Sequence, residues 1–102
     1  MGSYLPIDKC SNERLSNFVD TSDEWISKRS GIKNRHFVSD NEKTSDMAFF
    51  AATKAIENAH ISKNDIDLIV LATTTPDNTF PSTATLVQKK LEINAVSFDV
   101  QA

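Results

Sequence analysis

The run Leu68-Ile69-Val70-Leu71-Ala72 is the strongest strand signal in this chain of 102 residues. All five side chains are apolar, without the alternation of a half-exposed strand, and this is typical of a parallel strand buried on both faces. A polar loop follows over residues 73–79, and a helix is predicted to begin at Pro81 or Ser82. Residues 96–100 form a second predicted strand. This order of strand, helix and strand predicts a right-handed βαβ unit and an α/β fold class.

A second helix is predicted ahead of this unit, beginning at Ser45-Asp46. Small apolar residues recur along it at intervals of three or four positions, which gives one narrow face; they are Ala48, Ala52, Ala55, Ile56 and Ala59. His60 stands at the position where this helix should stop. Two strands cannot form a sheet whose faces and edges are all covered, so we expect the chain to be a piece of a larger α/β protein.

The composition argues against several classes of function. The chain is 39% hydrophobic and 25% charged, as is ordinary for a soluble globular protein. A net charge of −3 argues against nucleic-acid binding, and no apolar run is long enough to span a membrane. Two glycines cannot build a glycine-rich phosphate loop, and the single Cys10 offers no metal-ligand spacing. Without a signal segment, a cytoplasmic location is expected, with no metal and no nucleic-acid or membrane partner.

Residues 21–24, Thr-Ser-Asp-Glu, match a capping box that starts a short helix. In this interpretation the Thr21 hydroxyl accepts the backbone N–H of Glu24, whose carboxylate reaches back to the start of the helix. The helix is predicted to end near Ser30, because Gly31 can supply a left-handed stop. Asn12 is predicted to cap a shorter helix before it.

Trp25 and Arg29 share one face of this helix because they are four residues apart. A flat aromatic ring beside fixed positive charge suits a ligand that is part ring and part phosphate, such as a nucleotide-bearing acyl carrier. Four further residues add local positive potential: Lys28, Lys33, Arg35 and His36. The spacing alone leaves a structural alternative open, in which a half-buried Trp packs under an Arg side chain.

Several blocks of this sequence resemble, in the same order, β-ketoacyl-[acyl-carrier-protein] synthase III, a condensing enzyme with a thiolase-like fold. The most specific block is the run from Val19 to Ile26 with Arg29, Gly31-Ile32 and Arg35-His36. The other blocks are Gly2 to Pro6, Ala72 to Asp77, Phe80-Pro81-Ser82 and Phe98-Asp99-Val100. The resemblance implies a partial thiolase-like fold, the amino-terminal, βαβ-containing piece of a layered α/β/α sheet domain.

The resemblance also implies an acyltransferase that initiates fatty-acid synthesis. Such enzymes move an acyl group, commonly acetyl, from coenzyme A to a cysteine, and malonyl-acyl carrier protein then attacks the thioester with loss of carbon dioxide. Acyl-coenzyme A is thus a substrate, and no tightly bound cofactor is expected. Residues 1–102 would be an incomplete half-domain, with coenzyme A-facing helices and loop at 11–40. The βαβ unit at 66–100 would lead to the nucleophile loop.

Carried over residue by residue, the family's coenzyme A contacts match Thr21, Trp25 and Arg29. Phe80 matches a phenylalanine that reaches across a homodimer interface into the neighbour's acyl pocket. The catalytic cysteine, histidine and asparagine have no counterpart here, since Cys10 does not match the nucleophile, so no catalytic residue is assigned and the chain alone is predicted to be inactive. The alternatives are another coenzyme A-dependent thiolase-superfamily enzyme, such as a hydroxymethylglutaryl-coenzyme A synthase-like or quinolone-type enzyme, or a non-catalytic remnant that only binds coenzyme A or dimerises.

Overall fold

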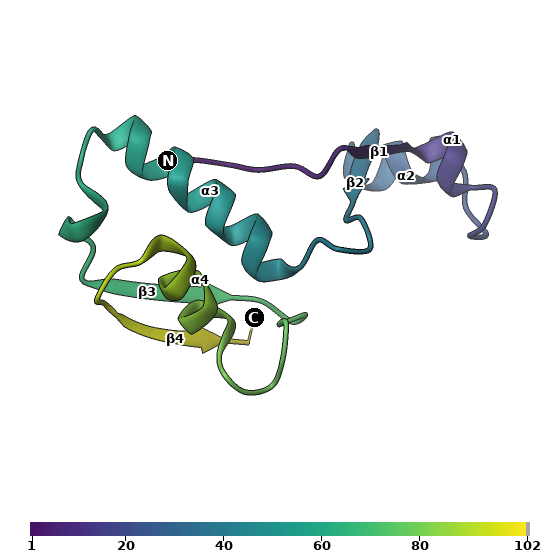
Figure 1. Cartoon of the computed structure of the whole chain (residues 1–102). Coiled ribbons are helices and arrows are strands. Elements are labelled where there is room, and N and C mark those ends of the chain that lie inside the picture. Colours follow the sequence, from purple (N-terminus) through teal and green to yellow (C-terminus); the bar gives the residue numbers. More distant parts are fainter. Residues whose placement is uncertain (102) are drawn as a thin grey trace. The chain divides into compact units, whose positions relative to one another are not determined.

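A computed structural model describes residues 1–101 of the chain, which divide into two compact units (Figure 1). One unit, the hairpin unit, is Leu5–Asn41. The other, the sheet unit, joins Met1–Tyr4 to the chain from Glu42 onward. Within residues 1–101, every helix is too short or too polar to cross a lipid bilayer.

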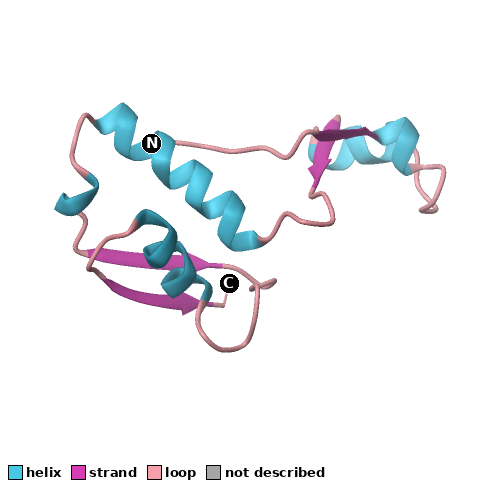
Figure 2. Cartoon of the chain, viewed as in Figure 1, coloured by secondary structure: helices cyan, strands magenta, loops and turns pink. Residues whose placement is uncertain are grey.

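The hairpin unit pairs two short antiparallel strands, β1 (Asp8–Ser11) and β2 (Asn34–Phe37) (Figure 2). Helices α1 (Asn12–Leu15) and α2 (Asp23–Ser30) lie between these strands in the sequence. The sequence favours a short strand over residues 35–38, one residue later than β2, and β1 has no apolar alternation that would predict it. Cys10 is fully buried in β1.

Asn12 has a different role from the predicted helix cap. Ser11 caps α1 by accepting the backbone N–H of Arg14 at 3.2 Å, while Asn12 is the buried first residue of the helix. The Asn12 side-chain amide donates to the Asp23 carboxylate and to the carbonyl of Ile32, each at 2.8 Å. Since a buried amide must be hydrogen-bonded, these contacts tie the start of α2 and the residue after its Gly31 cap to the start of α1.

The sheet unit contains the predicted βαβ arrangement. Strands β3 (Leu68–Ala72) and β4 (Val96–Val100) are parallel, and α4 (Thr83–Leu91) connects them. The long helix α3 (Thr44–Ala59) precedes them, followed by one 3-10 turn, η1 (Lys63–Asp65). The order and type of these elements confirm the predicted α/β class.

The core of the sheet unit lies between its helices and one face of the sheet (Figure 1). Leu71 from β3 and three apolar residues of α4 are buried there, namely Ala84, Val87 and Leu91. Helix α3 covers this cluster with Ala48, Phe49, Ala52 and Ile56. The small residues Ala48 and Ala52 of the predicted face therefore allow α3 to pack closely on this cluster.

The opposite face of the sheet is apolar and exposed. Leu68 and Val70 are 52% and 50% exposed, and Val96 and Phe98 on β4 are 67% and 44% exposed. The prediction of burial on both faces is therefore wrong for the structure of this chain, where α4 covers only the face that carries Leu71. Apolar residues on both faces of a parallel strand indicate a sheet whose two faces are suited to burial by other elements.

Candidate functional site

The candidate site forms at the start of α2, where the predicted cap is displaced by one residue. Ser22, and not Thr21, is the N-cap, and its hydroxyl accepts the backbone N–H of Trp25 at 3.2 Å. The helix ends as predicted at Gly31, whose φ of 73° is left-handed. The Thr21 side chain is consequently not used by the helix and is free to serve another purpose.

Trp25 and Arg29 lie together on the exposed surface of α2. The guanidinium carbon of Arg29 is 4.7 Å from the centroid of the indole ring, and 56% of Trp25 is exposed to solvent. This geometry is a cation–π contact, worth about 0.5–1 kcal/mol at an exposed site. The contact fits both interpretations, because a Trp that is 56% exposed under an Arg side chain is also the arrangement of the structural alternative.

A shallow pocket of about 320 Å³ adjoins the indole, lined by Asp20, Thr21, Ser22 and Trp25. The Thr21 hydroxyl oxygen is buried there and has no hydrogen-bond partner among the described residues. An unpaired buried hydroxyl costs about 1–3 kcal/mol, so this atom is a ready partner for a ligand or a water molecule. Thr21 also lines a second pocket of about 450 Å³ with residues of α1 and Lys33.

The positive charge around α2 is smaller than the sequence predicts. Lys28 and Arg29 are exposed in the last turn of the helix. Arg35, in contrast, donates to the carbonyl of Cys10 at 3.2 Å and to the Asn12 side chain, and His36 bonds the carbonyl of Pro6 through Nδ1 at 2.6 Å. These two side chains hold the hairpin unit together, so Lys28, Arg29 and Lys33 are the predicted positive residues that remain exposed.

Asp23 adds a negative group at the start of α2. A hydrogen bond from Asn12, a second from Ser27 and the charge of Lys33 together hold the pKa of Asp23 below its ordinary value. A carboxylate at this helix terminus also interacts favourably with the helix dipole. The buried Asn12 that fixes this arrangement was not predicted as a site residue, and its sequence context offers no signal beyond a helix-start pattern.

Phe80 and Cys10 are the remaining residues singled out by the sequence. Phe80 lies in the loop between β3 and α4 of the sheet unit, and 90% of its surface is exposed. Cys10 is 0% exposed, with its sulfur 3.5 Å from the carbonyl oxygen of Ser11. A thiol enclosed in this way cannot reach an acyl donor without opening of β1.

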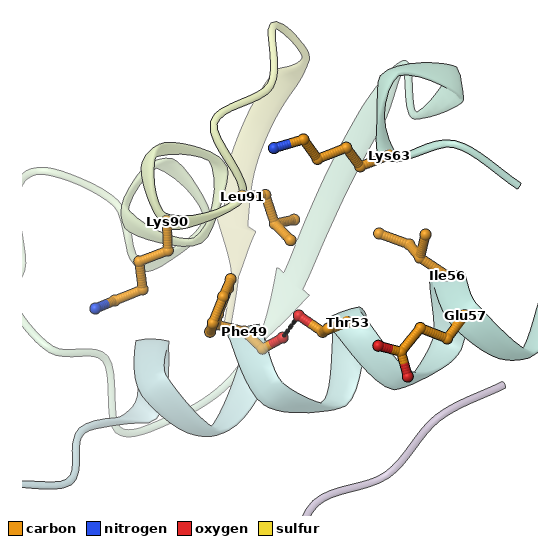
Figure 3. A pocket seen from close by; sticks show the side chains of 7 residues that line it. All are labelled: Phe49, Thr53, Ile56, Glu57, Lys63, Lys90 and Leu91. Atoms are coloured by element: carbon orange, nitrogen blue, oxygen red, sulfur yellow. Dashed lines mark hydrogen bonds between the residues drawn. The ribbon is translucent and has the colours of Figure 1, made fainter.

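A further pocket of about 330 Å³ lies in the sheet unit (Figure 3). Its apolar wall comes from Phe49, Ile56 and Leu91. Its polar side chains are largely engaged elsewhere: Lys90 pairs with Asp46 at 2.9 Å, Lys63 with Glu92 at 3.8 Å, and Thr53 donates to the carbonyl of Phe49 at 2.9 Å. The pocket therefore lacks the convergent polar groups that orient a ligand.

Comparison with known proteins gives consistent matches over the whole chain. The β-ketoacyl-[acyl-carrier-protein] synthase III of Ehrlichia canis is 60% identical over 103 residues, which is 100% of this chain and 32% of that protein. The crystal structure of 3-oxoacyl-[acyl-carrier-protein] synthase III from Aquifex aeolicus superposes with a TM-score of 0.90 at 46% identity, over 99% of this chain and 33% of that one. No protein-family model matches the chain.

The priming β-ketosynthase of the R1128 polyketide pathway also superposes, with a TM-score of 0.90 at 32% identity, over 99% of this chain and 30% of that one. These structures confirm the predicted fold class, an α/β partial thiolase-like fold. The chain spans about one third of the length of the curated relatives it matches. In sequence and in backbone, the chain is similar over its whole length to about one third of β-ketoacyl-[acyl-carrier-protein] synthase III proteins.

Proposed function

We propose that this chain forms the coenzyme A-facing part of an acyltransferase that initiates fatty-acid synthesis. The reaction condenses acyl-coenzyme A, acetyl-coenzyme A in the common case, with malonyl-acyl carrier protein to give 3-oxoacyl-acyl carrier protein. Support comes from the 60% identity to a β-ketoacyl-[acyl-carrier-protein] synthase III over the whole chain. It also comes from the exposed side chains on α2 and the Thr21 hydroxyl just before it.

The exposed pair of Trp25 and Arg29 carries this proposal. The Arg29 guanidinium lies over one face of the indole, and the adenine ring would stack on the other face. Stacking of a base on an aromatic side chain is worth about 1–3 kcal/mol. The guanidinium can at the same time donate to a phosphate oxygen, because its five N–H groups point in several directions. Thr21 would bond the ligand through its unpaired hydroxyl.

Phe80 would serve the acyl end of the reaction. A large apolar side chain that is 90% exposed gains from burial in a partner surface. In a homodimer of the complete enzyme, Phe80 would enter the acyl pocket of the other subunit and limit the length of the acyl chain. The domain roles of residues 11–40 and 66–100, as the coenzyme A-facing part and the unit before the nucleophile, belong to the same proposal.

The chain alone should not catalyse the condensation. The reaction needs a nucleophilic cysteine, and the single cysteine of this chain, Cys10, is enclosed in β1. We expect no acetoacetyl product above the buffer blank when the chain is mixed with acetyl-coenzyme A and malonyl-acyl carrier protein. Product formation by the isolated chain would contradict this statement.

A chimera provides the test of the proposed function. These 102 residues would replace the matching 103-residue segment of the Ehrlichia canis relative, so that the rest of the enzyme supplies the catalytic groups. We expect condensing activity, because the exchanged segments share 60% identity. Trp25→Ala should then raise KM for acetyl-coenzyme A about tenfold with little change in kcat, because the nucleotide is bound equally strongly in the ground state and in the transition state.

Lys28→Ala is the matched control for Arg29→Ala. Both residues are exposed cations in the last turn of α2, but only Arg29 contacts the indole. We expect Arg29→Ala to raise KM clearly and Lys28→Ala to leave it nearly unchanged. An active chimera whose KM is insensitive to Trp25→Ala and Arg29→Ala would contradict the binding assignment.

A second candidate function is priming of polyketide synthesis by a related coenzyme A-dependent condensing enzyme. The TM-score of 0.90 with the R1128 priming β-ketosynthase favours this possibility over unrelated ones. Its identity of 32% is well below the 60% found with the Ehrlichia canis protein. The preference of the chimera among acetyl and longer acyl donors would distinguish the two.

A further inference from the structure

The loop between β3 and α4, residues 73–82, is held at its centre by Asp77. One carboxylate oxygen of Asp77 accepts the backbone N–H of Ser45 at 2.8 Å, and the other accepts the Ser45 hydroxyl at 2.5 Å. Ser45 is only 2% exposed. Hydrogen bonds to a charged acceptor are stronger than neutral ones, so Asp77 ties the loop to the start of α3.

The same loop is held at its other end by Asp99 of β4. The Asp99 carboxylate accepts the backbone N–H groups of Thr83 and Ala84, each at 2.7 Å. Thr83 is fully buried, and its hydroxyl accepts the backbone N–H of Asp77 at 3.1 Å. Asp77, Thr83 and Asp99 thus form one connected network with Ser45.

This network surrounds the segment that carries Phe80. Residues 78–82 connect Asp77 to Thr83, and both of these residues are fixed by the hydrogen bonds above. A further bond, from the Thr44 hydroxyl to the carbonyl of Thr75 at 2.6 Å, holds the loop before Asp77. In open α/β sheets, ligands bind beyond the carboxyl ends of the strands, and Asp99 lies at that end of β4.

We propose that Asp77 and Asp99 are positioning residues that fix the 73–82 loop and thereby orient Phe80 for acyl-chain selection. The role in acyl-chain selection rests on the proposed function, whereas the hydrogen-bond network does not depend on it. Phe80 is 90% exposed, so its own packing does not determine where it lies. Its direction must come from the backbone that carries it, and the two carboxylates hold that backbone on both sides.

The first experiment measures loop order in the 102-residue chain by heteronuclear NOE on ¹⁵N-labelled backbone amides. Asp77→Ala should lower the NOE of residues 73–82 while the amides of α3 and β4 keep their values. Asp67→Ala is the matched control, because it removes an exposed aspartate at the opposite end of β3. Unchanged loop amides in Asp77→Ala would overturn the inference. If Asp77→Ala does not fold, Asp77→Asn replaces it, since it removes the charge and keeps one acceptor oxygen.

The second experiment measures chain-length preference in the chimera, as the ratio of kcat/KM for acetyl- and hexanoyl-coenzyme A. Phe80→Ala should change this ratio about tenfold, as expected when a pocket wall is removed. Asp77→Ala should change it in the same direction, and the Phe80→Ala/Asp77→Ala double variant should not exceed Phe80→Ala alone. Asp77→Asn should restore part of the preference, because its side chain can still pair with Ser45.

The outcomes separate the two proposals. If Phe80→Ala leaves the ratio unchanged, the role of Phe80 fails, and with it the consequence for acyl selection, whatever the NOE values show. If Phe80→Ala changes the ratio and Asp77→Ala does not, only the positioning inference is overturned. A change in overall activity without a change in the ratio also counts against it, because that result indicates loss of folding and not of orientation.

Discussion

The hydroxyl of Thr21 is the single group whose removal should affect ligand binding and protein stability differently. It is buried and unpaired, while its neighbour Ser22 caps α2. Such an atom destabilises the ligand-free protein and contributes favourably only when a ligand supplies the missing hydrogen bond. The two effects should therefore respond in opposite directions to removal of the hydroxyl.

Thr21→Val provides this test. Replacing the hydroxyl by a methyl group of similar shape should raise the free energy of unfolding by about 1 kcal/mol, because an unpaired buried polar atom is removed. The same change should weaken coenzyme A binding. Urea denaturation followed by Trp25 fluorescence measures the first effect and calorimetry the second. Thr21→Ser keeps the hydroxyl and should retain binding. A Thr21→Val protein that binds normally would exclude contact through this atom.

The sequence predicts the site only in part. The contact of Trp25 and Arg29 could be predicted because a four-residue spacing places both on one helix face. The cap could not be assigned to Ser22 because two adjacent hydroxyls both suit an N-cap. The bonds of Asn12 to Asp23 and Ile32 depend on contacts between distant residues, which no local pattern contains.

Helix ends show how single backbone positions contribute to element stability. Gly31 after α2 and His60 after α3 have left-handed φ values of 73° and 56°. Glycine adopts this region freely, whereas a residue with a Cβ atom does so at a cost. Gly31→Ala should therefore lower the stability by about 1 kcal/mol, although a Cβ there meets no atom within 4 Å.

His60→Gly should do the reverse and raise the melting temperature, because it relieves the same conformation at the end of α3. Thermal unfolding followed by circular dichroism measures both variants. The pair controls for general effects of substitution, since the two changes are expected to have opposite signs. A melting temperature lowered by His60→Gly would show that the histidine side chain stabilises the helix end in another way.

The start of α3 should make stability depend on pH. The backbone N–H of Lys43, at 2.9 Å, and the Lys90 ammonium lower the pKa of Asp46 below its ordinary value of 3.8. A carboxylate with a lowered pKa stabilises the fold above pH 3.8, and this contribution is lost as the pH falls through the lower folded value. Asp46→Asn should thus be less stable than the parent at pH 7, with a difference that shrinks in acid.

Urea denaturation at a series of pH values measures this difference. Lys90→Met should move the acid loss to higher pH, because it removes the second group that lowers the pKa of Asp46. A constant difference between Asp46→Asn and the parent at every pH would contradict a charge-based contribution.

The apolar pattern of each strand explains whether that strand could be predicted from the sequence. Both β3 and β4 were expected at their observed bounds, because continuous or alternating apolar residues are a local signal. Strand β1 was missed because Asp-Lys-Cys-Ser has no such pattern and forms through pairing with β2. The exposed sheet face was not predicted, since the sequence of a strand indicates that a face is apolar but does not supply the element that covers it.

For the whole molecule, the two units carry different parts of the proposed function. The hairpin unit holds Thr21, Trp25 and Arg29, and the sheet unit holds Phe80 with its positioning network. The chain spans about one third of its curated relatives, and its sheet shows an apolar face formed by Leu68, Val70, Val96 and Phe98. The three residues proposed for nucleotide binding all lie within the hairpin unit.

The central claim is that Trp25 and Arg29 bind the nucleotide end of an acyl-coenzyme A. The most direct measurement is titration of the chain with coenzyme A while the fluorescence of Trp25, its single tryptophan, is recorded and circular dichroism confirms folding. We predict saturable quenching of the Trp25 fluorescence by coenzyme A and no quenching by pantetheine. Arg29→Ala should weaken coenzyme A binding about tenfold, and Lys28→Ala should leave it unchanged. Unchanged fluorescence of the folded chain at millimolar coenzyme A, or equal quenching by pantetheine, would contradict the claim.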